Sequence, residues 1–207
     1  MNAKQTIFTL TITVTIGLIG WMFLFASPKA LTPIDYVHWV ENPDNGLKQV
    51  KNIGNLRFSL QYKPVEYVIA NEEKSASLDA VLVHNRKEQL DGMQYFNLRY
   101  SLNNSQQNIV KAAGSIEAQQ QLIYYLSYSL QQDIRLVEGN DTLPCQLFHF
   151  ARNHGLTPHA DFVIGFESKN EAADKRLIIN EKAFNTGTVQ FNIASADLND
   201  VPKLLTN

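Results

Sequence analysis

The residues of this chain best suited to chemistry lie between positions 145 and 161. This segment contains the sole cysteine, three of the five histidines and a carboxylate: Cys145, His149, His154, His159 and Asp161. Thiolate, imidazole and carboxylate groups bind zinc and similar ions, and a thiolate within hydrogen-bond reach of a histidine base can act as a nucleophile. Two kinds of site therefore have to be weighed, a metal centre and a Cys145 nucleophile.

The element that carries Cys145 and His149 bears on both kinds of site. Residues 144–152 alternate as a strand does, although Pro144 and Gly155 would also bracket a helix. We favour the strand, in which Cys145 and His149 stand about 13 Å apart, too far to share an ion. On a helix they would be neighbours. The simpler expectation is a core-facing thiol with histidines on a strand and in a loop, so we assign no catalytic residue, metal or cofactor.

Other motifs with a known mechanism do not occur in the sequence. There is no phosphate-binding loop, zincin motif, Cys-x-x-Cys pair or nucleophile elbow. The net charge of −2 and the pI near 6.2 come without a basic cluster, which argues against nucleic acid as a partner. These observations leave catalysis open but favour a protein that is not an enzyme.

Aromatic side chains suggest a different kind of site. Residues 116–130 are expected to form the main core helix, with Leu122 and Leu126 on its buried face. Tyr124, Tyr125 and Tyr128 wrap partly around this helix, so some of them must reach its edge, where a phenol can bury its ring and keep its hydroxyl in water. Packing at the edge of the core would account for these tyrosines, and the more specific alternative is that they form a protein-binding surface. We take these three tyrosines as the candidate interaction residues.

An apolar run from residue 7 to residue 26 is the strongest signal for location. It carries no charge, and about 20 such residues span the hydrocarbon core of a bilayer as a helix. A cleaved signal peptide, with processing near Ala26, is the alternative, but its apolar stretch is usually shorter. We therefore expect an uncleaved signal anchor, with the lipid bilayer as its partner.

The flanks of this run give the orientation and the division of the chain. Lys4 lies on the short side, while Asp35 and Glu41 follow on the long side, which favours a cytoplasmic N-terminus. The single cysteine forbids an intrachain disulfide and suits a bacterial envelope better than a disulfide-stapled secreted domain. We expect a cytoplasmic N-terminus (1–6), a transmembrane anchor (7–26), a juxtamembrane segment with a short helix (27–45) and a periplasmic domain (46–207).

The periplasmic domain is expected to be α+β, with a largely antiparallel sheet and a few packed helices. Alternating patterns predict strands at 47–53, 56–62, 95–102, 134–137, 144–152, 162–166, 176–180 and 188–194. Capping and spacing predict helices at 33–40, 64–69, 78–91 and 116–130, with a last helical turn from Ser195. The grouping of strands favours an antiparallel sheet.

These expectations lead to two functional hypotheses of different classes. The first is a non-enzymatic assembly, scaffold or binding subunit of a bacterial envelope complex, held in the inner membrane and working with a protein partner or a second copy of itself. The alternative is a membrane-tethered hydrolase or metal-binding enzyme that uses the residues between Cys145 and Asp161. A sensor of small ligands is a third, less favoured interpretation.

Overall fold

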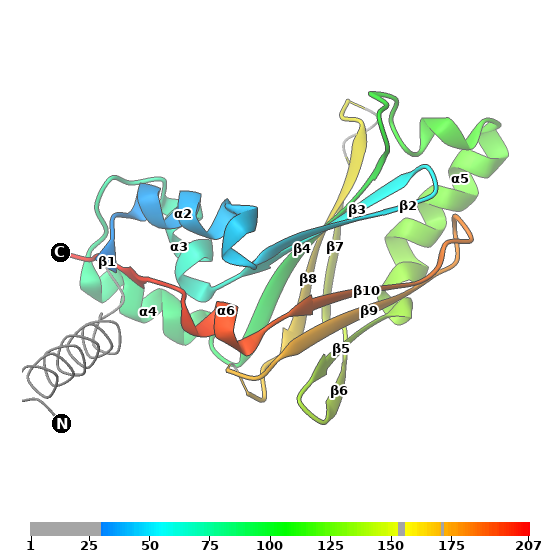
Figure 1. Ribbon diagram of the computed structural model, residues 1–207. Coiled ribbons are helices and arrows are strands. Elements are labelled where there is room, and N and C mark those ends of the chain that lie inside the picture. Colours follow the sequence, from blue (N-terminus) through cyan, green and yellow to red (C-terminus); the bar gives the residue numbers. More distant parts are fainter. Residues whose placement is uncertain (1–29, 153–155, 171) are drawn as a thin grey trace, which may run out of the picture.

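Two antiparallel sheets form the centre of the molecule, with one group of helices at one end and a further helical segment at the opposite end (Figure 1). The computed structural model describes residues 30–152, 156–170 and 172–207. The expected α+β domain with antiparallel strands is confirmed. The expected transmembrane segment 7–26 lies outside the described residues. Within the described ranges, no helix is long and apolar enough to cross a membrane.

The larger sheet has five strands, and its alternation of side chains follows the sequence pattern. Its order is β2 (Lys48–Ile53), β3 (Leu56–Lys63), β4 (Met93–Leu102), β8 (His159–Glu167) and β7 (Leu147–Ala151), with every neighbour antiparallel. Phe58 on β3, Phe96 on β4 and Phe162 on β8 are fully or almost fully buried, while Arg57 and Arg99 on the opposite face are exposed. One face therefore belongs to the core, as the period of two requires.

The smaller sheet has four strands and faces the first across the same core. Its order is β10 (Gly187–Ile193), β9 (Lys175–Glu181), β5 (Ile134–Glu138) and β6 (Asp141–Pro144), again antiparallel. Leu136, Leu177 and Phe191 from this sheet join the buried cluster that holds the inner side chains of the larger sheet. The sequence predicted most of these strands but not their division into two sheets.

Side chains and connections link the two sheets at both edges. At one edge, Gln49 of β2 reaches the backbone of Asn192 in β10: its Oε1 accepts from the Asn192 N–H at 3.2 Å, and its amide donates to the Asn192 carbonyl. At the other edge, the Gln146 N–H between β6 and β7 donates to the Gly165 carbonyl of β8 at 2.9 Å. Pairing of this kind covers edge strands that would otherwise be open to other chains.

A helical layer closes one end of the sheets. It contains α2 (Pro33–Glu41), η1 (Pro43–Asn45), α3 (Val65–Glu73) and α4 (Ala80–Leu90). Thr32 caps α2 by accepting from the Asp35 N–H at 3.3 Å, and the proline that follows suits the first helical position. Tyr36 and Val40 on α2 are fully buried in the main core, so this short helix is packed into the domain.

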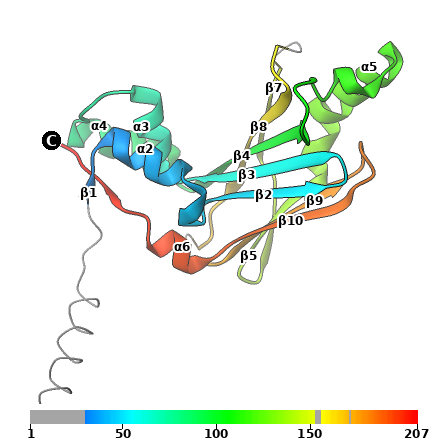
Figure 2. The ribbon, with the colours of Figure 1, turned by 45° about the horizontal axis from the view of Figure 1, so that its top comes forward.

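The two ends of the described chain meet at this helical layer (Figure 2). The short strands β1 (Ala30–Leu31) and β11 (Lys203–Leu204) pair in parallel, after α6 (Ser195–Asn199) returns the chain from β10. The Leu205 N–H donates to the Leu31 carbonyl at 2.7 Å, and Asn207 exchanges backbone hydrogen bonds with Leu78 and Ala80 at the start of α4. The residues before the first helix are therefore fixed to the C-terminal segment.

Residues 116–130 do not form the single α-helix that their spacing predicted. After η2 (Lys111–Ala113), the chain forms α5 (Ile116–Tyr124), a π-helical turn η3 (Tyr125–Ser129) and a 3₁₀ turn η4 (Leu130–Asp133). Ser115 caps its start by accepting from the Ala118 N–H at 3.2 Å. Leu122, Leu126 and Leu130 still face the core, so the buried face was predicted correctly although the winding changes.

Candidate functional site

Cys145 is a buried thiol whose surroundings favour its protonated form. It is buried, 7 % exposed, and its Sγ donates to the Leu147 carbonyl at 3.1 Å. Burial raises the pKa of the thiol to about 11, and the Gly165 backbone and Arg135 lower it only in part. A nucleophilic cysteine needs its thiolate near neutral pH, whereas this environment keeps the proton on sulfur.

His149 and His159, the two described histidines of this cluster, lie on the outer face of the larger sheet, whereas the thiol is buried. His149 on β7 is exposed and stands opposite Val163 in the register with β8. His159 and Asp161, two residues apart on β8, face each other with 3.0 Å between Nε2 and Oδ2. Asp161 is also held by Arg99 of β4, with 2.5 Å between Nε and Oδ1 and 3.2 Å between Nη2 and Oδ2. Asp161 is thus part of an ordinary surface ion pair.

The four described residues of the sequence-predicted cluster therefore do not come together as one site. His154 lies outside the described residues, and among the described parts of the chain no three histidine, cysteine or acidic side chains are grouped so that they could hold a metal ion. The strand predicted at 144–152 is confirmed only in part: β6 ends at Pro144, Cys145 and Gln146 lie in no strand, and β7 spans Leu147–Ala151, where His149 is exposed.

The three candidate tyrosines separate into two environments. Tyr124 and Tyr128 are exposed by 63 % and 61 %, with ring centroids 5.3 Å apart. The Arg152 guanidinium lies 5.9 Å from the Tyr128 ring and donates to the Ser127 hydroxyl at 2.8 Å. Tyr125 turns inward instead. We call Ile116, Tyr124 and Tyr128 the aromatic stripe, because Ile116, 69 % exposed, lies two turns before Tyr124 on α5.

Tyr125 belongs to a polar group beneath the helix. Its hydroxyl donates to Asp133 Oδ2 at 3.0 Å and accepts from the Lys182 N–H at 3.4 Å, and the Lys182 ammonium pairs with the same carboxylate. Burial and the bond to Asp133 raise the pKa of the Tyr125 phenol. These residues help line a cavity of about 710 Å³ between α5 and the β9–β10 turn. Since Tyr125 ties the helix to this turn, it positions the exposed pair.

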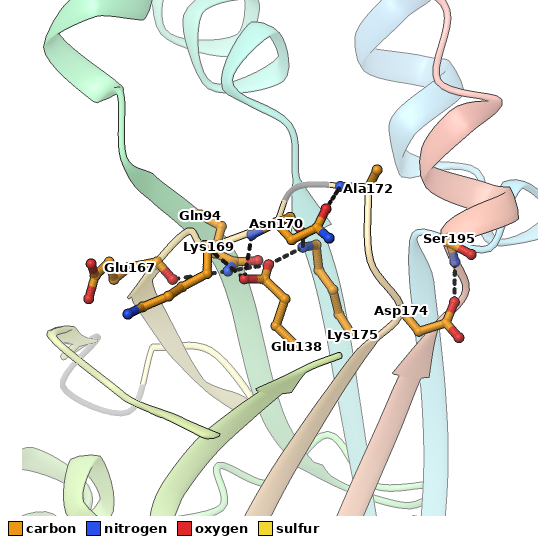
Figure 3. Close-up of polar contacts among 9 residues, drawn as sticks. All are labelled: Gln94, Glu138, Glu167, Lys169, Asn170, Ala172, Asp174, Lys175 and Ser195. Atoms are coloured by element: carbon orange, nitrogen blue, oxygen red, sulfur yellow. Dashed lines mark hydrogen bonds and ion pairs between the residues drawn. The ribbon is translucent and has the colours of Figure 1, made fainter. Parts of the chain in front are cut away.

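A buried ion pair that the sequence did not signal lies between the two sheets (Figure 3). Glu138, at the end of β5, and Lys175, at the start of β9, are 2 % and 1 % exposed, with 2.6 Å between Oε1 and Nζ. Gln94 of β4 donates its amide to the same Oε1 at 3.0 Å. The other oxygen accepts from the N–H groups of Lys169 and Asn170, each at 2.8 Å.

This network fastens the connection between β8 and β9 to both sheets. Burial raises the pKa of Glu138, but the bonds from Lys175, from the two backbone amides and from Gln94 outweigh it and hold the pKa below its ordinary value. Beside it, Asp174 accepts from the Ser195 N–H at 2.7 Å, which lowers the pKa of Asp174 (Figure 3). Both carboxylates therefore stay ionised at neutral pH and hold turns in place.

A second cavity, of about 720 Å³, lies between the helical layer, the start of β4 and the segment after α6. Gln94 lines it, so the buried network forms part of its wall. Tyr36 of α2 also lines it and is fully buried. A sequence pattern could not reveal this cavity, because its walls come from segments far apart in the chain.

Comparison with known proteins gives no assignment. The chain matches no protein-family model, no curated protein and no solved structure. Any function must therefore be argued from the residues themselves.

Proposed function

We propose that this protein is a non-enzymatic binding or assembly subunit of a bacterial envelope complex, anchored by residues 7–26 in the inner membrane with its domain in the periplasm. The uncharged apolar run supports the anchor, and the flanking charges support the orientation. The observation that carries the binding role is the aromatic stripe, whose side chains are each more than 60 % exposed. Interfaces are enriched in tyrosine because its ring supplies a large contact area and its hydroxyl a hydrogen bond.

The arrangement of the elements supports the same proposal. The described chain starts at Ala30 beside the helical layer, whereas α5 lies at the far end of the sheets (Figures 1 and 2). A tether joined at Ala30 would place the helix that carries the stripe at the end of the domain farther from the membrane. The Tyr124–Tyr128 contact and the Arg152 guanidinium also order the two rings before a partner arrives, which lowers the entropic cost of binding.

The alternative of a tethered hydrolase or metal enzyme has less support. It needs a reactive Cys145 or a set of converging ligands, and the thiol is buried while His149 faces outward. Stoichiometric metal in the purified full chain, or loss of an activity on His149→Ala with unchanged folding, would favour it over a binding role.

Site-specific photocrosslinking in membranes tests the proposal. The full chain would carry p-benzoylphenylalanine in place of Tyr128, and the control would carry it in place of Val81, which is equally exposed at 65 % but lies on α4. We expect a discrete protein adduct from position 128 only, and a weaker one when Tyr124→Ser is added. A second copy of this chain in the adduct would identify a homo-oligomer. Equal crosslinking from both positions, or a monomer without any adduct, would contradict the proposal.

A further inference from the structure

The outer edge of β10 is open along most of its length. β10 is an edge strand of the smaller sheet, and among the described residues it pairs only with β9. It contains no charged residue and no proline, and its register with β9 continues without a bulge from Gly187 to Ile193. Charges, prolines and bulges are the features that usually prevent an edge strand from pairing with another chain. β10 therefore retains the capacity to pair with a further strand.

The hydrogen bonds of Asn192 show which backbone groups face this edge. Its N–H donates to Gln49 Oε1 at 3.2 Å and its carbonyl accepts from the Gln49 amide, so both groups point away from β9. In an antiparallel ladder, residues that bond to one neighbour alternate with residues that face the other side. The N–H and C=O groups of Thr188 and Gln190 therefore also point outward. Both residues are exposed, and no described residue forms a hydrogen bond with these groups.

A lysine of the neighbouring sheet defines the chemistry of a partner for this edge. β2 lies on the same side of the molecule as β10 (Figure 2), and the Lys51 ammonium is 5.8 Å from the centre of the Phe191 ring. Lys51 is exposed and forms no ion pair with a described residue. A carboxylate on a strand added to β10 would supply the missing counter-charge. A second copy of the chain, paired through its own β10, brings no carboxylate to this position.

We propose that the β10 edge binds an extended, acidic segment of a partner protein, which adds to the smaller sheet as a further strand. The backbone of this segment exchanges hydrogen bonds with Thr188 and Gln190, and one of its carboxylates pairs with Lys51. In strand addition of this kind, main-chain hydrogen bonds provide affinity and side chains provide specificity. The β10 edge is separate from the aromatic stripe, so this inference does not depend on the proposed function.

Hydrogen exchange resolved to single amides tests the proposal on the full chain in lipid nanodiscs. The probe is a blocked peptide, Thr-Val-Glu-Val-Thr, and the control peptide has lysine in place of the glutamate. The Glu peptide should slow exchange at Thr188 and Gln190 saturably, whereas the amides of Val189 and Phe191, which face β9, should not change. The Lys peptide should bind at least about threefold more weakly, the factor for one exposed ion pair.

A matched pair of lysine variants tests the charge. Lys51→Gln should weaken binding of the Glu peptide by about threefold. Lys48→Gln on the same strand is the control. Lys48 stands opposite Gln61 and Lys51 opposite the buried Phe58, so the two lysines lie on different faces of β2, and the control should bind as the unaltered chain does.

A proline variant tests the backbone pairing. Gln190→Pro removes an N–H that faces outward and leaves the hydrogen bonds to β9 in place, and edge strands tolerate proline. The Tm should change little, while the peptide should no longer slow exchange at Thr188. The proposal is overturned if the peptide gives no saturable protection at Thr188 and Gln190, or if both peptides bind equally. Protection that rises with the concentration of the chain alone would also overturn it, because the occupant would then be a second copy.

Discussion

Glu138 and Lys175 occupy positions where either charge alone would be strongly unfavourable. Removing an ion from water costs several kcal/mol, and only a close partner with further hydrogen bonds offsets this cost. Here the carboxylate has four donors, from Lys175, Gln94 and two backbone amides. The pair therefore stabilises a specific connection between β8 and β9 more than it stabilises the core in general.

Removing the buried cation tests this role. Lys175→Met keeps the aliphatic length but leaves Glu138 buried without its cation, so the free energy of unfolding should fall by about 3–5 kcal/mol. Urea unfolding of the full chain, followed by tryptophan fluorescence, measures it. Lys87→Met is the control, because in its pair with Glu66 the two side chains are 45 % and 29 % exposed, so the loss should be about 1 kcal/mol or less. Equal losses in both variants would show that the buried pair has no special role.

The same carboxylate should make stability depend on pH. The pKa of Glu138 lies below its ordinary value of 4.5 in the folded chain, so its contribution is present above the unfolded pKa and is lost as the pH falls through the folded value. The stability difference between the unaltered chain and Glu138→Gln should therefore be constant above about pH 5.5 and shrink in acid. Urea midpoints measured across this range check it, and a difference that does not change with pH would contradict it.

Residue patterns alone could not have found this network. In the sequence, Glu138 is the polar residue just after the predicted strand at 134–137, and Lys175 is the residue just before the predicted strand at 176–180. Their signs are visible in the sequence, but their separation of 2.6 Å arises only when β5 pairs with β9. Cys145 was predicted correctly in part: the sequence favoured a core-facing thiol, and Cys145 is buried, but it lies between β6 and β7 and not on one strand with His149.

At the scale of elements, local patterns were informative wherever one face is buried. Alternation located β3 and β4, and the Thr32-Pro33 start located α2 within a residue. The π-helical turn at Tyr125–Ser129 had no such signal, because the leucine spacing there fits an ordinary helix. The pairing of β1 with β11 was also beyond local patterns, since each has two residues and the pair joins opposite ends of the described chain.

This terminal pairing can be tested by removing one backbone donor. Leu205→Pro abolishes the N–H that donates to the Leu31 carbonyl, and the loss should lower the free energy of unfolding by about 1–3 kcal/mol. Leu205→Ala keeps the donor and trims a side chain that is 48 % exposed, so it serves as the control. Hydrogen exchange should report faster opening of α2 in the proline variant alone. Equal exchange in both variants would mean that the pairing does not hold the helical layer.

For the whole molecule, the two ends of the described chain meet beside α2 while the aromatic stripe lies on the far helix. The proposed tether and the proposed binding surface would therefore lie at opposite ends of the domain. The cavity lies at the end with the helical layer, and Gln94 connects it to the buried ion pair between the sheets. The proposed location determines in which compartment the stripe could meet a partner, so the location needs its own test.

Cysteine labelling distinguishes the proposed location from the alternatives. Val81→Cys in a Cys145→Ala background gives the chain a single thiol at a site that is 65 % exposed in the unaltered protein. We expect a membrane-impermeant maleimide to label it in intact spheroplasts, with the label recovered in the membrane fraction. The unaltered chain is the control, since its Cys145 is buried and should stay unlabelled. Label in the soluble fraction would indicate cleavage near Ala26, and label only after lysis would place the domain in the cytoplasm and contradict the envelope proposal.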